Sequence, residues 1–442
     1  MQHQNSGTFV WEYFFIHLSF PIDNVDDMLR MPPAQQATIF HEYIHYLQNL
    51  VVPLNIEMIA HKLKCLRLYL HEIATSDESM IAIPLPLTKR ADAGDENIRT
   101  REFLDCIFEN QFYCYEAKES IFAVRDICQS LEEEFPSWIP YEILEGQKVI
   151  RAACKTGRKT IPLILNTWCI EENMACLLEH RLFHNENHLP EYPYRYCDWL
   201  CSQDIPAFSA EEWRIAALCE ASLSSQQPPV CFYNIMQAIK SKAFLPDSLD
   251  AFRTFLDENH LLVEFHDNGF WKNLEQEIFD EISIIFPKNL HEDIKRTAQC
   301  LMDVFQKAEC MRRLDMFYFT RRIYCDRREP AEVFHHLLKI FSLPPVLDSN
   351  QSIWGTPDTP FFRVLLILKA FYEIFHLSKL GSKEHPFQCA LYEICQKERG
   401  ALFSDEVCRN MPWKQTERQK LCLFAAYWYY FSLDGKNLYI KM

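Results

Sequence analysis

Hydrophobic and polar residues change their spacing several times along the chain, and each change indicates an element. Residues 8–20 (TFVWEYFFIHLSF) are β-branched and aromatic, which predicts a strand or a pair of strands. Pro32 and Pro33 then favour the start of a helix that runs to about Leu50. A second amphipathic helix is expected over 54–74.

Further along, the pattern alternates between loops, strands and helices. A polar, proline-containing loop is expected around 76–96, and helical periodicity follows over 97–135. Residues 148–165 predict two short strands joined as a hairpin. A strong helix is expected directly afterwards, over 167–183, and the chain reads as helical from about 208 to its end.

Composition supports a mainly α fold. The 442 residues include only 9 glycines against 33 phenylalanines, which disfavours glycine-rich sandwiches and dinucleotide-binding folds. A chain of this length is expected to form two or three domains. We predict one domain over 1–245, with a helical insertion at about 54–147, and a helical domain over 246–442.

The formal net charge of −16 argues against nucleic acid or an anionic membrane surface as a partner. One stretch of this acidic chain is rich in arginine. We interpret it as a solvated helix face, and a phosphate or partner site is the alternative. The stretch contains Arg312, Arg313, Arg321, Arg322, Arg327 and Arg328.

The 18 cysteines include no C-x-x-C pair, and the N-terminal residues lack the pattern of a secretory signal. Reduced thiols and a cytoplasmic location are therefore expected. The most apolar run, residues 421–433, is shorter than the ~20 residues of a membrane-spanning helix. We expect a buried helix there and no membrane span.

The stretch TIFHEYIHYLQ (38–48) contains an H-E-x-x-H motif within the first predicted helix. Residues four apart share one face of a helix, so His41 and His45 can both offer an imidazole nitrogen to one Zn²⁺. Glu42 lies beside them and can accept a proton from a water that the metal activates. The motif therefore predicts Zn²⁺ as a cofactor.

The helix expected at 167–183 contains EENMACLLE, and here the sequence resembles the gluzincin type of H-E-x-x-H zinc peptidases. That group takes its third ligand from a glutamate on a second helix, which reads N-E-G-F-A in the aminopeptidase branch. The resemblance places Glu172 at the ligand position, Ala175 at the small residue and Glu179 seven residues after the ligand. It implies a zincin-like metal-binding domain at 1–245, with a small β element and two metal-binding helices.

The match departs from that group at several points. Asn173 stands where the group has glycine, and Glu172 lies 127 positions after His45, much farther than is typical. The exopeptidase signature G-x-M-E-N is absent, so aminopeptidase activity is not implied. Glu171 and Glu179 remain alternatives to Glu172 as the third ligand. Glu179 better suits a role in orienting the proton on a ligand histidine.

Residues close in sequence to Glu172 supply further candidates. His184 could donate a proton near the site, and Tyr194 could stabilise a developing oxyanion, as could Tyr192 or Arg195. Endopeptidase activity of narrow specificity on a protein or peptide is the expectation, with the C-terminal half shaping access or binding a protein partner. The alternative is a helical scaffold in which the motif is vestigial or structural.

Overall fold

The protein is described by a computed structural model and is mainly helical. The structure describes residues 6–10, 14–22, 31–83, 137–144, 147–156, 159–184, 191–262, 268–285, 292–326, 328–350 and 352–354, and, towards the C-terminus, 365–366, 368–371, 389, 391–392, 395–396, 404–418 and 422–440. The predicted mainly α fold class is confirmed. The helical periodicity expected at 97–135 and most of the expected loop at 76–96 lie outside these residues.

The N-terminal elements follow the sequence pattern closely. Strands β1 (Gly7–Val10) and β2 (Phe15–Leu18) pair antiparallel, as the aromatic run predicts. Helix α1 (Pro33–Val51) has proline in its first turn, where a missing N–H costs nothing. Val52 is extended because the residue before a proline avoids helical backbone, and Pro53 then opens α2 (Pro53–Thr75).

Short strands from the second half of the chain pair with strands of the first half. Strand β7 (Val346–Leu347) runs parallel to β2 and pairs with β8 (Ile353–Trp354), which gives a sheet of order β1-β2-β7-β8. Strand β9 (Asn437–Ile440) runs parallel to β3 (Met80–Ile83). Strands β7, β8 and β9 differ from the helical structure that the sequence predicts for this half of the chain. The domain boundary near 245 stays a prediction, and these two pairings join its two sides.

A three-stranded antiparallel sheet lies directly before the helix that begins at Thr167. It consists of β4 (Ser137–Leu144), β5 (Gln147–Thr156) and β6 (Lys159–Leu165), and its last two strands are the expected hairpin. Strands β3 and β4 lie within 54–147, so the described part of the predicted insertion is not wholly helical.

Helices dominate from Thr167 onward. The first, α5 (Thr167–Phe183), matches its predicted range, and the side chain of Asn166 caps it by accepting from the Cys169 N–H. The helical elements described after it include α6 (Glu191–Tyr194), α7 (Tyr196–Asp204), α8 (Pro206–Ser209), α9 (Glu212–Ser222), α10 (Pro228–Lys242), α11 (Leu249–Glu258), α12 (Asn268–Ile285), α13 (Glu292–Leu314), α14 (Tyr318–Thr320) with the π-helical turn η4 (Arg321–Cys325), α15 (Pro330–Phe341), α18 (Glu406–Asn410), the 3₁₀ turn η5 (Pro412–Gln415) and α19 (Leu423–Tyr430).

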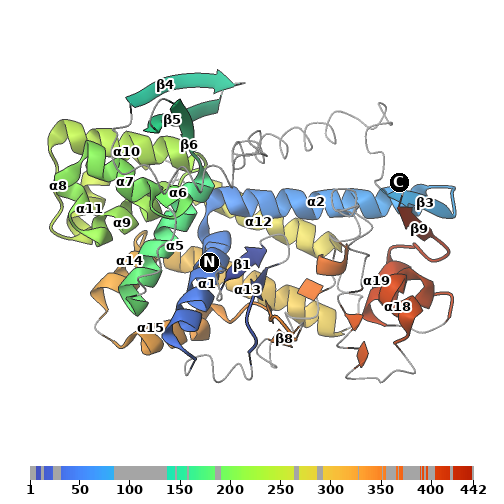
Figure 1. Ribbon diagram of the computed structural model, residues 1–442. Coiled ribbons are helices and arrows are strands. Elements are labelled where there is room, and N and C mark those ends of the chain that lie inside the picture. The colour runs from blue at the N-terminus through green and yellow to red at the C-terminus, as the bar shows by residue number, and fades with distance from the viewer. Residues whose placement is uncertain are drawn as a thin grey trace.

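Helix α2 lies along the long dimension of the molecule (Figure 1). It runs from the group α5–α11 at one end to β3, β9, α18 and α19 at the other, with α12 alongside. Arg67 on α2 is joined to Glu281 on α12 by two hydrogen bonds of 3.0 and 3.2 Å. Among the described residues, no helix combines the length and apolar character that crossing a membrane requires.

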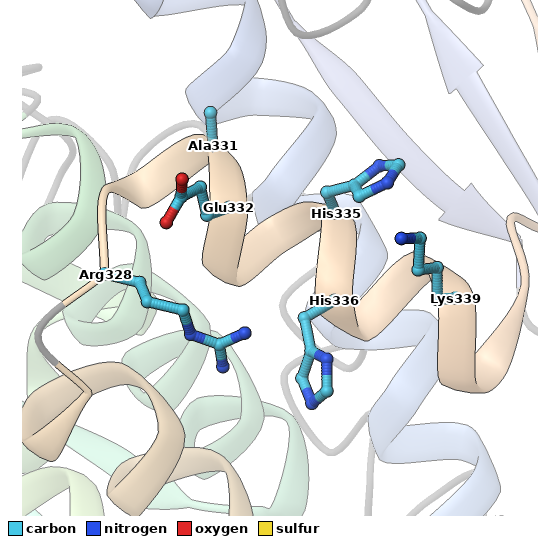
Figure 2. Close-up of a pocket in the computed structure, with 6 residues that line it drawn as sticks. All are labelled: Arg328, Ala331, Glu332, His335, His336 and Lys339. Carbon is cyan, nitrogen blue, oxygen red and sulfur yellow. The ribbon is translucent and has the colours of Figure 1, made fainter.

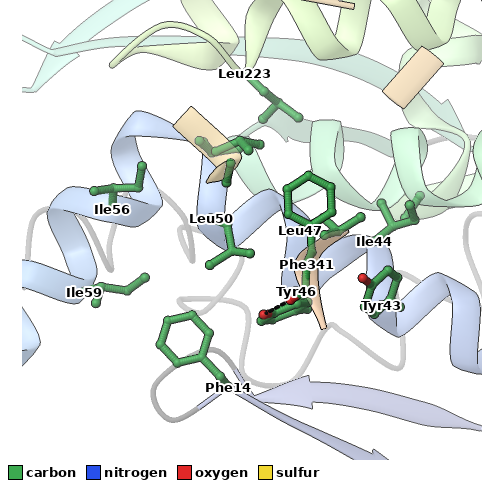
Figure 3. Close-up of a cluster of buried hydrophobic side chains, with 14 of the residues drawn as sticks. Phe14, Tyr43, Ile44, Tyr46, Leu47, Leu50, Ile56, Ile59, Leu223 and Phe341 are labelled. Carbon is green, nitrogen blue, oxygen red and sulfur yellow. Dashed lines mark hydrogen bonds between the residues drawn. The ribbon is translucent and has the colours of Figure 1, made fainter. Parts of the chain in front are cut away.

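Helix α1 lies within the hydrophobic core and is fixed there by its tyrosines (Figure 3). The hydroxyl of Tyr46 donates to the backbone carbonyl of Phe341, and that of Tyr43 donates to the carbonyls of Leu337 and Ser342. Each buried O–H therefore has an acceptor at the end of α15. These bonds hold α1 in one rotation about its axis, so His41 and His45 are directed at α5.

Candidate metal centre

The structure brings together side chains from two helices that are far apart in the sequence. His41 and His45 lie one turn apart on α1, and Glu172 lies on α5. The Nε2 atoms of the two histidines are 3.2 Å apart, and the Oε2 of Glu172 lies 3.1 Å from the first and 3.3 Å from the second. Three potential ligand atoms thus form a nearly equilateral triangle.

The size of this triangle suits a zinc ion. Zinc–nitrogen and zinc–oxygen bonds of roughly 2.0–2.2 Å in a tetrahedron put neighbouring ligand atoms about 3.3–3.5 Å apart. Among the described residues, His41, His45 and Glu172 are the group of three or more potential ligands whose atoms all lie within 4.8 Å of one another. Three protein ligands leave a fourth position open, which is the arrangement of catalytic zinc sites.

The outer nitrogen of each imidazole is held by a hydrogen-bond acceptor. The Nδ1 of His41 lies 3.0 Å from the Oε2 of Glu179, so a carboxylate oxygen there can accept a hydrogen bond from the Nδ1–H. The Nδ1 of His45 lies 2.8 Å from the Oε1 of Gln48. The amide of Gln48 cannot be turned round, because its Nε2 donates to the backbone carbonyl of Glu171, which only accepts.

These contacts determine where the protons of the neutral histidines lie. With Nδ1 as the donor in both rings, each Nε2 carries a lone pair, and both lone pairs meet the lone pairs of Glu172. Hydrogen bonds cannot satisfy the Nε2–Nε2 contact and both Nε2–Oε2 contacts at once. If one Nε2 carries a proton and donates to the other ring, the second Nε2 and Oε2 of Glu172 still face each other as two acceptors. A single cation satisfies all three. The donor set of two imidazoles and one carboxylate is one that zinc commonly takes.

The carboxylate of Glu172 is oriented by its own helix. Trp168, one turn earlier on α5, donates its indole N–H to Oε1 at 2.8 Å, which leaves Oε2 facing the two histidines. The two alternatives for the third ligand make other contacts. Glu171 accepts from the amide of Asn55 at 2.6 Å, and Glu179 contacts the far side of the His41 ring. The geometry therefore favours Glu172.

The pKa values reflect the same charges. Burial lowers the pKa of His41, but hydrogen bonds to Glu172 and Glu179 and their negative charges outweigh it and raise the pKa well above its ordinary value. Burial likewise lowers the pKa of His45, and the charge of Glu172 reverses the effect. For Glu172 burial raises the pKa, whereas the two histidines bring it well below its usual range. The site therefore favours positive charge beside an ionised Glu172.

Glu42 is buried beside the two histidines. Burial raises the pKa of its carboxyl group, and the nearby positive charges of His41 and His45 act in the opposite direction. The backbone N–H of Phe9 on β1 also acts on this carboxylate, lowers its pKa and so favours its ionised form. Glu42 thus lies against strand β1, where Gly7 packs on its side chain, and its charge interacts with those of the two histidines and of Glu172.

Asn173, which replaces the glycine of the gluzincin pattern, has a structural role. Its side chain is fully buried, and its Oδ1 accepts from the backbone N–H groups of Cys197 at 2.8 Å and Asp198 at 3.1 Å. Its Nδ2 donates to the carboxylate of Asp198 at 2.9 Å. The asparagine therefore attaches the start of α7 to α5. Ala175 is also fully buried, in line with the tight packing of α5.

The remaining sequence candidates differ in their distance from the metal centre. The Tyr194 ring lies beside that of His41, with the ring centroids 6.0 Å apart. His184 is exposed and ends α5 in a left-handed conformation, and nothing in the described contacts brings it to the histidine pair. The side chain of Tyr192 lies outside the description. Arg195 forms an ion pair with Asp198 at 2.9 Å.

Three residues that orient the site, Gln48, Trp168 and Asn55, are not among the candidates predicted from the sequence. Two of these carry a signal that the sequence could have offered. Gln48 lies three residues after His45 on the same helix, and Trp168 lies four residues before Glu172, so each is a neighbour on the helix surface. Asn55 contacts Glu171 across two helices and has no such local signal.

The cationic stretch 312–328 is not one solvated face. Arg312 is fully buried and bonds the carboxylate of Glu220 at 3.0 Å, whereas Arg313 is exposed. Arg321 pairs with Asp315 and Asp250. Arg328 pairs with Asp326 and borders a surface hollow of about 380 Å³ along α15 (Figure 2). The described lining of this hollow contains none of the three potential metal ligands: it consists of Arg328, Ala331, Glu332, His335, His336 and Lys339.

Comparison with protein-family models, with curated proteins and with solved structures finds no match for this chain. The zincin-like core and the gluzincin resemblance therefore stay predictions. Function has to be inferred from the side chains of the site itself, and its geometry identifies the chain no further than a protein with a candidate metal centre of two histidines and one glutamate.

Proposed function

We propose that this protein is a zinc-dependent hydrolase that cleaves peptide bonds, with His41, His45 and Glu172 as the metal ligands. The convergence of their three acceptor atoms carries the proposal, because Gln48 and Glu179 already occupy the other imidazole nitrogens. A structural metal site is normally closed by four protein ligands. Three ligands and an adjacent buried carboxylate support a catalytic site instead.

A zinc ion bound here would supply an activated water and polarise the carbonyl of a substrate. The residues of the chain then have distinct tasks. Glu42 accepts a proton from the attacking water and passes it to the leaving amine, which its burial and raised pKa favour. Glu179 and Gln48 hold the ligand imidazoles in one tautomer and one orientation. Tyr194, beside His41, is the candidate for stabilising the oxyanion.

Peptide bonds are the proposed substrate because the two site helices resemble those of gluzincin peptidases in HEYIH and EENMA. The zincin-like core, with its small N-terminal sheet and two metal-binding helices, belongs to the same proposal. Endopeptidase activity of narrow specificity is part of it too, together with a cytoplasmic location. A protein partner for the helical C-terminal half stays a prediction.

Metal content tests the proposal most directly. We expect the purified protein to bind about one equivalent of zinc and to lose it in a His41→Ala/His45→Ala variant. Glu42→Gln should keep the zinc, because Glu42 is not a ligand, and should abolish cleavage of a fluorogenic peptide library. His184→Ala is the matched control, since that exposed side chain is not brought to the ligands.

Two results would contradict the proposal. A protein that binds no zinc, and folds equally well without the two histidines, would support the helical scaffold. A Glu42→Gln variant with full activity would remove Glu42 from its role while leaving the metal centre in place.

A further inference from the structure

Strand β1 lies along α1 with matching spacing. Phe9 packs against Tyr46, with ring centroids 6.2 Å apart, and Gly7, two residues earlier, lies on Glu42, one turn earlier on α1. Two residues of a strand advance about 6.6–6.8 Å. Four residues of a helix, as from Glu42 to Tyr46, advance about 6 Å. The two elements therefore meet at two successive points.

Gly7 provides space rather than an unusual backbone angle. Gly435 is the glycine with a positive φ among the described residues, so the backbone of Gly7 would accept other residues. A Cβ at position 7, however, would lie 2.6 Å from the Cγ of Glu42 and 2.9 Å from its Oε1. Such distances are too short for any non-bonded contact. Any side chain at position 7 would displace Glu42.

The backbone of Phe9 adds a directed contact. In the ladder, the carbonyl of Ser6 accepts from Ser19 and alternate residues of β1 bond to β2, so the N–H of Phe9 points away from β2. This N–H also favours the ionised form of the Glu42 carboxylate, whose pKa it lowers. Because β1 is at the edge of the sheet that the described strands form, its outward N–H groups are available for such use.

We infer that strand β1 positions the general base: Gly7 leaves the space that the Glu42 side chain occupies, and the Phe9 N–H holds its carboxylate in place. This inference rests on the proposed function and assigns Gly7 and Phe9 as positioning residues. The polar contacts described for His41, His45 and Glu172 are all to residues of α1 and α5. Changes at position 7 should therefore disturb the base and leave metal binding intact.

A thermal double-mutant cycle tests the contact without any measurement of activity. We expect Gly7→Ala to lower the Tm by several degrees when Glu42 is present and not to lower it in a Glu42→Ala background, where the Cγ and carboxylate are gone. Thr8→Ala, an exposed change on the same strand, is the control and should leave the Tm nearly unchanged in both backgrounds. An equal loss in both backgrounds would overturn the contact between Gly7 and Glu42.

Kinetics test the positioning role, with the best peptide found in a fluorogenic library as the probe. Gly7→Ala should lower kcat tenfold or more, with the KM and the zinc stoichiometry unchanged, because only the base is displaced. If Gly7→Ala folds poorly, the pair Phe9→Ala and Phe9→Pro serves instead. Both lose the ring, only the proline lacks the N–H, and an edge strand tolerates it. The proline variant should have a further severalfold lower kcat.

The possible failures are distinguishable. A kcat unchanged by Gly7→Ala, or a Phe9→Pro variant as active as Phe9→Ala, would overturn the positioning role. A wild-type protein that binds zinc but cleaves no peptide would instead count against the proposed function, and the thermal cycle would still decide whether β1 and Glu42 make the contact.

Discussion

The Nδ1 of His45 lies 2.8 Å from the Oε1 of Gln48, and this contact decides which imidazole nitrogen carries the proton. Gln48 is itself fixed by its bond to the Glu171 carbonyl on α5. One buried amide therefore connects the two site helices and sets the tautomer of a potential zinc ligand. The pair shows that the site depends on residues outside the H-E-x-x-H motif.

Replacing Gln48 should weaken metal binding. We expect Gln48→Leu to lower zinc affinity about 10–100-fold, because the imidazole of His45 loses the acceptor that orients it. Competition with a chromophoric zinc chelator measures the change. Gln35→Leu, earlier on the same helix, is the control. An affinity that is unchanged in Gln48→Leu would show that the tautomer of His45 is fixed by other means.

The residue that departs from the gluzincin pattern should not be replaceable by glycine. Asn173→Gly leaves two buried N–H groups of α7 without their acceptor and puts glycine inside a helix. We expect a loss of about 3 kcal/mol or more in the free energy of unfolding. Urea denaturation of Asn173→Gly and Asn173→Ala separates the two effects, with alanine about 1 kcal/mol less damaging. A variant as stable as the wild type would exclude this anchoring role.

Acid should destabilise the protein partly through His17 on β2. Burial, with a smaller effect of the nearby charge of Lys369, lowers the pKa of His17 from 6.5 to about 4. The unfolded chain binds this proton first, so His17 contributes stability that is complete above about pH 6.5 and is lost as the pH falls towards 4.

The size of this effect follows from the two pKa values and is about 3 kcal/mol. Urea denaturation at several pH values measures it. In His17→Gln, which cannot titrate, the fall in stability between pH 6.5 and pH 4 should be smaller by that amount. Identical pH profiles for the two proteins would contradict a lowered pKa at His17.

Neighbouring arginines on α13 should differ strongly in importance. Arg312 is buried and bonds Glu220 and the carbonyl of Met316, so Arg312→Met leaves the carboxylate of Glu220 in the core without its positively charged partner. We expect a cost of about 3–5 kcal/mol. Arg313→Met, which removes the ion pair of an exposed arginine with Glu309, should cost under about 1 kcal/mol. Equal effects in denaturant melts would mean that burial of the Arg312 pair does not matter to stability.

Long elements and local motifs could be predicted from the sequence. Periodicity and prolines located α1, and the dense apolar pattern located α5, because both helices exceed four turns and are therefore long enough to show a pattern. His41, His45 and Glu172 were singled out from their spacing and from the resemblance, and the structure brings them together.

The short strands and the buried arginine could not be predicted. Strands β7 and β8 have two residues each, too few to show alternation, and they form because β2 offers a partner from the other end of the chain. The burial of Arg312 depends on Glu220, 92 positions away, and nothing local to either residue indicates it. The short strands and the burial of Arg312 both depend on contacts between segments far apart in the sequence, and no local sequence pattern indicates such contacts.

Glu172 follows His45 by 127 positions, and this separation has a thermodynamic consequence. An ion bonded to both residues closes the intervening stretch into a ring and restricts the unfolded chain as well as the folded one, provided the bonds persist. By the loop-entropy relation, a cross-link that closes a loop of this length lowers the entropy of the unfolded chain. This favours the folded state by on the order of 5 kcal/mol. The two site helices would then act as the ends of a cross-link, so occupancy by a metal would raise the free energy of unfolding.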